Sequence, residues 1–317
     1  MQQYMLKRLL LAIPTVFGAV TLVFFAMQLA PGDPAALFIP PDLPPSRAEE
    51  LEKQINAKYG FDDPVYVQYA NYLERLVQLD LGESLREGRS VGDDLRRRVP
   101  HTLRLGLVSL FVSAVLGIAI GVLSAIYRGT WIDNLSMLLA LLGVSLPSFW
   151  LALMLILLFA VRVPWLPPSG LGDSAWSVDG VKHMVLPVAV LSLGGMGALA
   201  RYTRSSMLEV INLDYVRTAR AKGLAGRVVI LRHALRNAMI PIVTILGLNF
   251  GFVLSGAVIV ETVFAWPGIG RYLIEGVNGR DFPVVQATVL LIAIAFVLGN
   301  LVTDLMLVYI DPRIRFE

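Results

Sequence analysis

The sequence predicts an all-α polytopic membrane protein with six transmembrane helices, an external helical segment and a cytoplasmic helix-turn-helix. Hydrophobic residues make up 56% of the 317 residues and charged residues only 16%, against about 45–50% and about 25% in soluble domains. Mean hydropathy is +0.67. We expect residues 1–317 to form a single transmembrane domain, in which residues 31–101 are an external insertion and residues 201–237 are the cytoplasmic helix-turn-helix.

The first predicted span covers residues 9–30 and follows Lys7 and Arg8. A charged start before an apolar run is also typical of a secretory signal peptide, but this run exceeds the usual h-region of about 7–15 residues. We therefore expect an uncleaved helix. Five further stretches approach or exceed the roughly 20 apolar residues that cross a bilayer core, at residues 102–126, 135–161, 184–200, 238–260 and 284–310.

The fourth span, 184–200, is the shortest of the six. Pro187 and the glycines at 194, 195 and 197 are expected to loosen a helix there. The same glycines offer a second interpretation, because small residues allow transmembrane helices to pack closely.

The distribution of Lys and Arg predicts the orientation. Short loops rich in these residues stay on the cytoplasmic side. A cytoplasmic N-terminus places Arg128, the 201–237 segment and the tail with Arg313 and Arg315 on that same side. Residues 96–98, three arginines on the outer side, disagree with the pattern, but long loops are largely exempt from the rule.

The outer segment, residues 31–101, contains two predicted helices. Four prolines at 40, 41, 44 and 45 precede a polar helix over residues 47–57, and residues 65–79 carry Tyr66, Tyr69, Tyr72 and Leu76 at helical spacing. Such a segment can face an external donor protein or line an entrance; a lid that only packs on the span ends is the alternative.

The cytoplasmic segment, residues 201–237, is unusually basic for this chain. Leu208, Ile211, Tyr215 and Ala219 recur at helical spacing, glycines at 223 and 226 interrupt the pattern, and residues 228–235 resume it. This predicts a helix, a glycine turn and a second helix. Its eight basic residues are Arg201, Arg204, Arg217, Arg220, Lys222, Arg227, Arg232 and Arg236.

The motifs of several enzyme classes are missing from the sequence. It contains no cysteine, no phosphate-binding loop of the G-x-x-x-x-G-K-[ST] type, no H-E-x-x-H zinc motif and no G-x-S-x-G turn. Its three histidines, at 101, 183 and 233, are far apart, so we predict no metal site. No nucleic-acid-binding motif accompanies the net charge of +3. We therefore expect no enzymatic activity, no cofactor bound by this chain and no nucleic-acid partner.

Ionisable residues within the spans are few. Asp304 is the one acid well inside a predicted span, and Glu261 is at the end of the fifth. Because charges in the membrane core usually mark ion paths, an ion-coupled secondary transporter acting alone is the alternative function. Asp304 also suits a capping role, or a pairing with Arg313 or Arg315.

The segment DYVRTARAKG at residues 214–223, followed by RHALRN at 232–237 and by Pro241, resembles the cytoplasmic coupling motif of ABC importer permeases. The version is similar to that of the dipeptide/oligopeptide/nickel class. Further matches to that class are APGDP at 30–34, LDLGES at 79–84, ETVFAWPGIG at 261–270 and DPR at 311–313. The long insertion after the first span resembles the first of the two permeases that such importers carry.

The chain departs from the general family pattern at one place. Where the pattern has Glu-Ala-Ala six residues before its glycine, this chain has Arg217, Thr218 and Ala219, so a salt bridge from that Glu is not carried over. The resemblance implies that the segment docks on an ATPase subunit. The residues to which this role is assigned are Asp214, Tyr215, Val216, Arg217, Thr218, Ala219, Arg220, Ala221, Lys222, Gly223, Arg232, His233 and Asn237.

The resemblance also implies the partners and the cargo. They are a second homologous permease, two ATP-binding subunits that hold ATP and Mg, an extracytoplasmic solute-binding protein and the lipid of a bacterial or archaeal inner membrane. The cargo is expected to be a dipeptide, an oligopeptide or a related small solute, whose identity stays open. Candidate pathway residues, chosen as polar or amphipathic groups in apolar helices, are Ser145, Ser148, Trp150, Asn249, Ser255 and Glu261.

Overall fold

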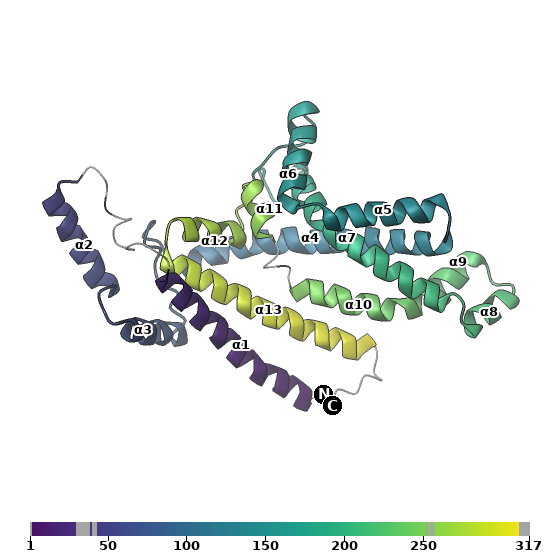
Figure 1. Ribbon diagram of the computed structural model, residues 1–317, viewed down its shortest axis with the longest axis horizontal. Coiled ribbons are helices and arrows are strands. Elements are labelled where there is room, and N and C mark those ends of the chain that lie inside the picture. Colours follow the sequence, from purple (N-terminus) through teal and green to yellow (C-terminus); the bar gives the residue numbers. More distant parts are fainter. Residues whose placement is uncertain (1, 30–38, 40–42, 252, 254–256, 311–317) are drawn as a thin grey trace. The chain divides into compact units, whose positions relative to one another are not determined.

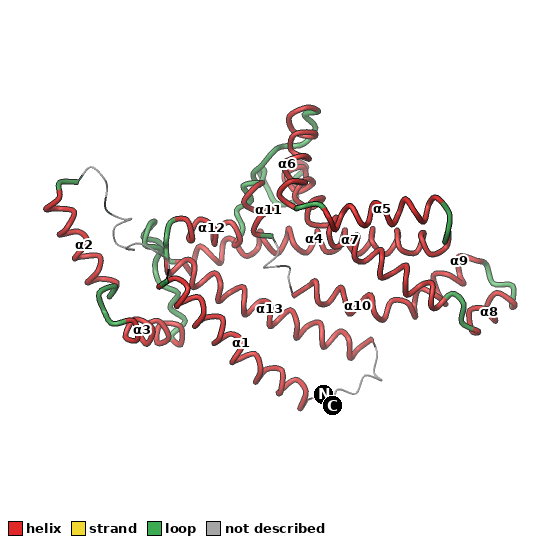
Figure 2. The backbone as a smooth tube through the Cα atoms, in the orientation of Figure 1, coloured by secondary structure: helices red, strands yellow, loops and turns green. Residues whose placement is uncertain are grey.

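A computed structural model describes residues 2–29, 39, 43–251, 253 and 257–310, and over these residues the chain is built from helices and loops with no strand (Figures 1 and 2). Contacts divide the chain into two compact units. The first comprises residues 1–100 and 268–294, and the second residues 101–267 and 295–317. Five described helices are long and apolar enough to cross a membrane, or six if one bent pair forms a single span.

The first unit begins with α1 (Gln2–Gln28), which confirms the first predicted span. It continues with α2 (Pro45–Tyr59) and α3 (Val65–Val77), which confirm the two helices expected in the 31–101 segment. It also contains the start of α4 (Val91–Ile126), α12 (Ile269–Asn278) and the first part of α13 (Phe282–Ile310). The second span was thus predicted to begin too late, because the polar first turns of α4 extend the helix beyond its apolar part.

Side-chain contacts hold the first unit together. Ser84 Oγ donates to Asp281 Oδ2 at 2.6 Å, and the Tyr272 hydroxyl donates to Asp94 Oδ2 at 3.3 Å. The guanidinium of Arg98 lies 4.3 Å from the centre of the Tyr272 ring, and Arg97 donates to Asp94 at 2.8 Å. Two of the three arginines that disagreed with the charge pattern therefore have partners inside this unit.

The second unit contains the bent pair. Helix α5 (Trp131–Ser145) is followed by α6 (Ser148–Ile156) and the π-helix η2 (Leu157–Arg162), and the two directions differ by 104°. The predicted span over 135–161 is therefore a bent pair of helices, which can count as one span, and not a single continuous helix. The break falls before Pro147, whose ring disfavours helical geometry at the preceding residue, and Leu146 is extended, with ψ 130°.

Helix α7 (Val178–Val210) is continuous through Pro187 and the glycines, so the fourth span is much longer than the 17 residues expected. The second interpretation of the glycines is confirmed. A Cβ on Gly197 would lie 2.2 Å from the Ala140 carbonyl oxygen of α5, and one on Gly121 of α4 would lie 2.5 Å from the Ala200 carbonyl oxygen. Helices α4 and α5 therefore approach α7 to a distance that only glycine permits.

The fifth predicted span, 238–260, is wrong at both ends. The helical path begins earlier, with α9 (Gly226–Val228), the π-helix η3 (Val229–Ala234) and α10 (Leu235–Gly251). The end of the predicted span falls in a separate short helix, α11 (Val258–Val263). Helix α13 confirms the sixth span.

Candidate functional site: the helix between α7 and α10

A short helix, α8 (Asp214–Ala221), connects α7 to the helices α9, η3 and α10 (Figure 1). The expected order of helix, glycine turn and helix is confirmed, but residues 208–210 belong to the end of α7. Helix α8 therefore begins at Asp214 rather than at residue 208.

Helix α8 is held by a small apolar contact. Val216 and Ala219, one turn apart, are buried with Val229 of η3, and Val210 at the end of α7 packs against them. Burial of each such side chain contributes about 1 kcal/mol or more. This contact ties α8 to the helix that precedes it and to the helix that follows it.

A hydrogen bond adds a second tie between α8 and α10. Asn237 Nδ2 donates to the Tyr215 hydroxyl oxygen at 2.7 Å, although the two residues are 22 positions apart. Beneath it, Met207 of α7 packs with Ala234 and Ala238 of the α10 side, and with Val122 and Ala125 of α4. Helix α8 is therefore tied to α7, η3 and α10, which in turn pack on the end of α4.

The turn after α8 depends on Gly223, whose φ is +77°. Its backbone N–H donates to the Arg220 carbonyl oxygen at 2.9 Å. A left-handed conformation at the end of a helix favours glycine, which lacks a Cβ. The turn allows the chain to reverse into α9.

The basic residues of the segment fall into two groups. Arg201 and Arg204 lie in α7, and Arg204 is neutralised by Asp133 of α5. The ion pair of Arg217 with Asp214 is long, at 3.7 Å, and both side chains are largely exposed, so it contributes little. Five further cations are exposed and form no ion pair with a described residue: Arg220, Lys222, Arg227, Arg232 and Arg236. The exposed cations of the segment are thus spread over α8, the turn after it, α9, η3 and the start of α10.

The remaining residues assigned to this segment also have clear positions. Thr218 Oγ1 donates to the Asp214 carbonyl oxygen at 2.9 Å within α8. Ala221 closes α8 and is exposed, and His233 is half-buried in η3. All thirteen residues therefore lie in α8, the turn that follows it, η3 and the first turn of α10.

The six pathway candidates are more dispersed. Ser145, Ser148 and Trp150 flank the break between α5 and α6, where Ser145 and Trp150 are exposed. Ser255 and the side chain of Asn249 lie outside the described residues. Glu261 is fully buried in α11 and accepts a hydrogen bond from Thr102 Oγ1 at 2.6 Å, which places it in the interior of this chain.

Arg104 of α4 was missed by the sequence analysis. Its guanidinium lies 4.9 Å from the centre of the Trp266 ring and 6.0 Å from that of Trp176. Its Nε and Nη2 are buried without a hydrogen-bond partner among the described residues. An arginine three positions into a predicted span is itself a signal, because cations within spans are costly and usually functional.

Two family profiles match this sequence. Residues 117–316 match the binding-protein-dependent transport system inner membrane component, and residues 1–106 match the N-terminal part of such a membrane component. The chain is 42% identical over 317 residues, all of both chains, to the glutathione transport system permease protein GsiC of Escherichia coli (strain K12). The same identity and coverage relate it to GsiC of Shigella flexneri serotype 5b (strain 8401).

Solved structures share the fold. The MetNI methionine ABC transporter in an inward-facing conformation matches with a TM-score of 0.53 at 21% identity, covering 68% of this chain and 96% of that chain. A second crystal form gives a TM-score of 0.57 at 20% identity, covering 69% and 96%. This chain therefore belongs to the binding-protein-dependent transport system inner membrane components, the multi-pass permease subunits of ATP-driven importers that work with ATPase and solute-binding proteins.

Proposed function

We propose that this chain is one of two homologous permeases that, with two ATP-binding subunits and an extracytoplasmic binding protein, import short peptides or a related small solute. In this assembly the chain has cytoplasmic termini, and ATP and Mg bind to the ATPase subunits rather than to this chain. The basic residues of the 201–237 segment support that orientation, since such loops remain in the cytoplasm. Family membership favours this assembly over an ion-coupled carrier acting alone.

The observation that carries the proposal is the mounting of α8. Its buried residues, Val216 and Ala219, pack on its own chain, while Arg217 and Arg220 are exposed. The exposed side is the part of α8 that is free to enter a groove on an ATPase subunit. A force on α8 is transmitted to α7 and α10, because the apolar contact and the Tyr215–Asn237 hydrogen bond join it to both.

ATP drives such a permease by shifting a population between inward-facing and outward-facing states. A ligand shifts an equilibrium only through its different affinity for the two states. Closure of the ATPase subunits around ATP supplies that difference, and α8 passes it to the spans. The permease itself needs no catalytic residue for this step.

The relatives support a peptide-like cargo. The GsiC proteins are named for glutathione, which is a tripeptide, and they match all of this chain at 42% identity. A carrier of varied peptides needs a pathway with few dedicated ligands, and the exposed Ser145 and Trp150 at the α5–α6 break remain candidates to line it. Arg104, with unpartnered N–H groups between two tryptophans, is a further candidate for contact with a peptide carboxylate.

The test is to tag the chain at its natural expression level, solubilise the membrane gently and identify co-purifying proteins by mass spectrometry. An ATPase and a second six-span protein in comparable amounts are the expected result. Proteoliposomes of that complex should then take up labelled glutathione or a tripeptide only with ATP and the binding protein present. Recovery of the chain alone in several detergents, together with ATP-independent uptake, would overturn the proposal.

A further inference from the structure

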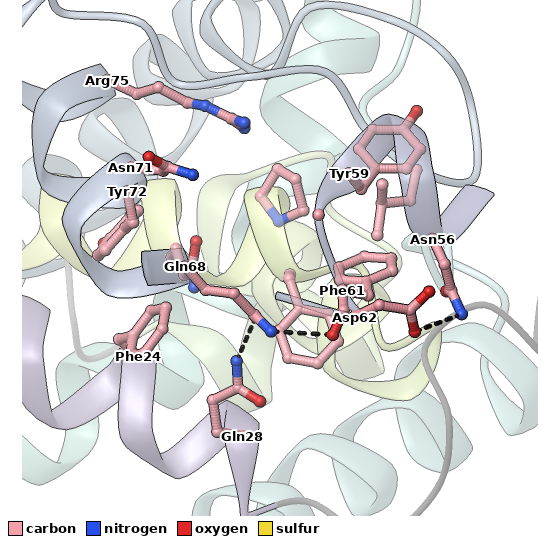
Figure 3. A pocket seen from close by; sticks show the side chains of 15 residues that line it. Phe24, Gln28, Asn56, Tyr59, Phe61, Asp62, Gln68, Asn71, Tyr72 and Arg75 are labelled. Carbon is pink, nitrogen blue, oxygen red and sulfur yellow. Dashed lines mark hydrogen bonds between the residues drawn. The ribbon is translucent and has the colours of Figure 1, made fainter. Parts of the chain in front are cut away.

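The first unit contains a cavity of about 330 Å³ between the end of α1, helices α2 and α3 and the start of α13 (Figure 3). This volume is at the lower end of the roughly 300–1,000 Å³ typical of small-molecule sites. We call it the α2–α3 cavity. It is too small for a folded partner.

The lining has an unusual composition for a space between helices of a membrane protein. Four residues of α3 line the cavity, and three of them are amide or charged: Gln68, Asn71 and Arg75, which accompany Tyr72. The carboxamides are Gln28, Asn56, Gln68, Asn71 and Gln286, and the aromatic residues are Phe24, Tyr59, Phe61, Tyr72 and Phe282. Carboxamides both donate and accept hydrogen bonds, as peptide groups do.

Internal hydrogen bonds hold the cavity open. Gln68 accepts from Gln28 Nε2 at 2.6 Å and donates from its own Nε2 to the carbonyl oxygens of Phe61 and Asp63 at 2.9 Å and 2.8 Å. Gln68 thereby joins α1, α3 and the turn between α2 and α3. The Phe24 and Tyr72 rings stack beside it, with centres 5.6 Å apart. The walls are therefore set before any ligand arrives.

Two polar atoms of the lining have no partner. The Asn56 Oδ1 and the Tyr72 hydroxyl are buried without a hydrogen bond among the described residues. Burial, and next the neighbouring Tyr69, raise the pKa of Tyr72 above its usual range. Unsatisfied buried groups are costly, and a polar ligand beside them removes that cost.

Two opposite charges lie at the rim, on different elements. Arg75 is in the last turn of α3, and Asp62 precedes α3; Figure 3 shows them on opposite sides of the cavity. Neither forms an ion pair with a described residue; Asp62 Oδ1 accepts only from Asn56 Nδ2, at 3.0 Å. At a rise of about 1.5 Å per residue, the ten steps from Val65 to Arg75 alone cover about 15 Å of helix axis.

We infer that the α2–α3 cavity binds a short zwitterionic peptide, with its terminal ammonium at Asp62, its terminal carboxylate at Arg75 and its peptide groups against the carboxamides. A single amino acid carries its two charges too close together to reach both residues. A tripeptide, at about 3.3 Å per residue, spans about 10 Å. The side chains of Asp62 and Arg75 bridge the remaining distance to its two charged ends. The site is distinct from the pathway candidates in the second unit.

The test measures direct binding rather than uptake, so it stands apart from the transport proposal. The full-length chain, with the subunits that co-purify with it, is placed in nanodiscs and titrated calorimetrically with trialanine. N-acetyl-trialanine and trialanine amide, which each lack one terminal charge, are the matched ligands. Trialanine should bind, and each blocked peptide should bind about fivefold to tenfold more weakly.

Variants assign the binding to this cavity. Arg75→Gln should weaken the binding of trialanine about fivefold to tenfold and leave the affinity for trialanine amide unchanged. Asp62→Asn should weaken the binding of trialanine to the same extent and leave the affinity for N-acetyl-trialanine unchanged. Arg47→Gln is a matched control in the same segment, since its side chain does not line the cavity; it should bind trialanine as the wild type does.

Three outcomes would overturn the inference. The first is that trialanine does not bind at millimolar concentration. The second is that Arg75→Gln and Asp62→Asn bind trialanine as tightly as the wild type does. The third is that the two variants lose affinity for the binding protein while their affinity for peptides is unchanged. The last outcome would instead make the cavity part of a protein–protein contact. Normal folding of the variants is checked by their thermal unfolding in the same nanodiscs.

Discussion

Arg204 of α7 forms a two-point ion pair with Asp133 of α5: Nε donates to Oδ1 at 2.7 Å and Nη2 donates to Oδ2 at 2.8 Å. The carboxylate is 4% exposed, and it also accepts from Ser124 Oγ of α4 and from the Gly129 N–H. Three residues, from α4, the following turn and α7, thus donate four hydrogen bonds to one buried acid.

The first prediction follows from that pair. Replacing Asp133 with Asn leaves Arg204 partly buried without its counter-charge, and removal of one partner of a buried pair costs about 3–5 kcal/mol. We expect a clear loss of thermal stability of the solubilised protein. Asp214→Asn, which removes an exposed partner of a 3.7 Å pair, should change it by less than about 1 kcal/mol.

A double replacement tests the cause. Asp133→Leu with Arg204→Met removes both charges and should recover most of the stability, because a buried pair is often replaceable by apolar residues. Equal instability of the single and double variants would assign the loss to packing instead.

The turn after α8 gives the second prediction. Gly223→Pro removes the N–H that donates to Arg220 and requires a φ near −65° where the chain has +77°. We expect ATP hydrolysis without uptake, in a chain still present in the membrane. Both rates are measured in proteoliposomes of the complex.

Gly226→Ala is the control for that experiment. Gly226 has no positive φ, and a Cβ there meets no atom within 4 Å. It should transport normally, whereas normal uptake by Gly223→Pro at wild-type membrane levels would contradict the coupling role of the turn.

Charge reversal on α8 gives the third prediction. Arg217→Glu with Arg220→Glu changes only exposed side chains, so Val216 and Ala219 should stay packed and the chain should stay inserted. We expect reduced co-purification of the ATPase subunits, with a dependence on salt. Arg47→Glu, on the exposed face of α2, should leave that association unchanged, and an equal loss in both variants would refute a specific contact.

Arg104 gives the fourth prediction. Arg104→Leu should raise the KM for a peptide with a free carboxylate about tenfold or more, since a charge-assisted contact is lost. Arg104→Lys should raise the KM less than Arg104→Leu does, because lysine keeps the charge but not the planar guanidinium over the tryptophans. Unchanged uptake kinetics in Arg104→Leu would show that the residue is structural.

The segment between the first two long helices gives the fifth prediction. Deletion of residues 42–95 is expected to impair delivery from the binding protein more than assembly with the ATPase. A narrower deletion of residues 45–77 is the better test, because it keeps two hydrogen bonds that hold the first unit together. These are the bonds of Ser84 with Asp281 and of Tyr272 with Asp94. Loss of the whole complex with the narrower deletion would make the segment structural.

The sequence by itself determined the class of the molecule and its most polar elements. Apolar length predicts spans because backbone groups in lipid must be satisfied within a helix, and this identified α1 and α13 closely. Helical spacing and the two glycines predicted α8 and its turn, since Gly223 needs a conformation that other residues rarely adopt. The residues assigned to coupling could be nominated in advance because they lie within one short stretch of the sequence, residues 214–237.

Only the tertiary structure decided which residues meet. Arg204 and Asp133 are 71 residues apart, and Arg75 and Asp62 lie at the rim of a cavity that is also lined by residues of α1 and α13. The glycines at 121 and 197 strengthen helix contacts rather than weaken helices, because their lack of a Cβ matters only when another backbone approaches. Pairing, burial and close approach depend on long-range contacts, and local pattern and composition do not encode those directly.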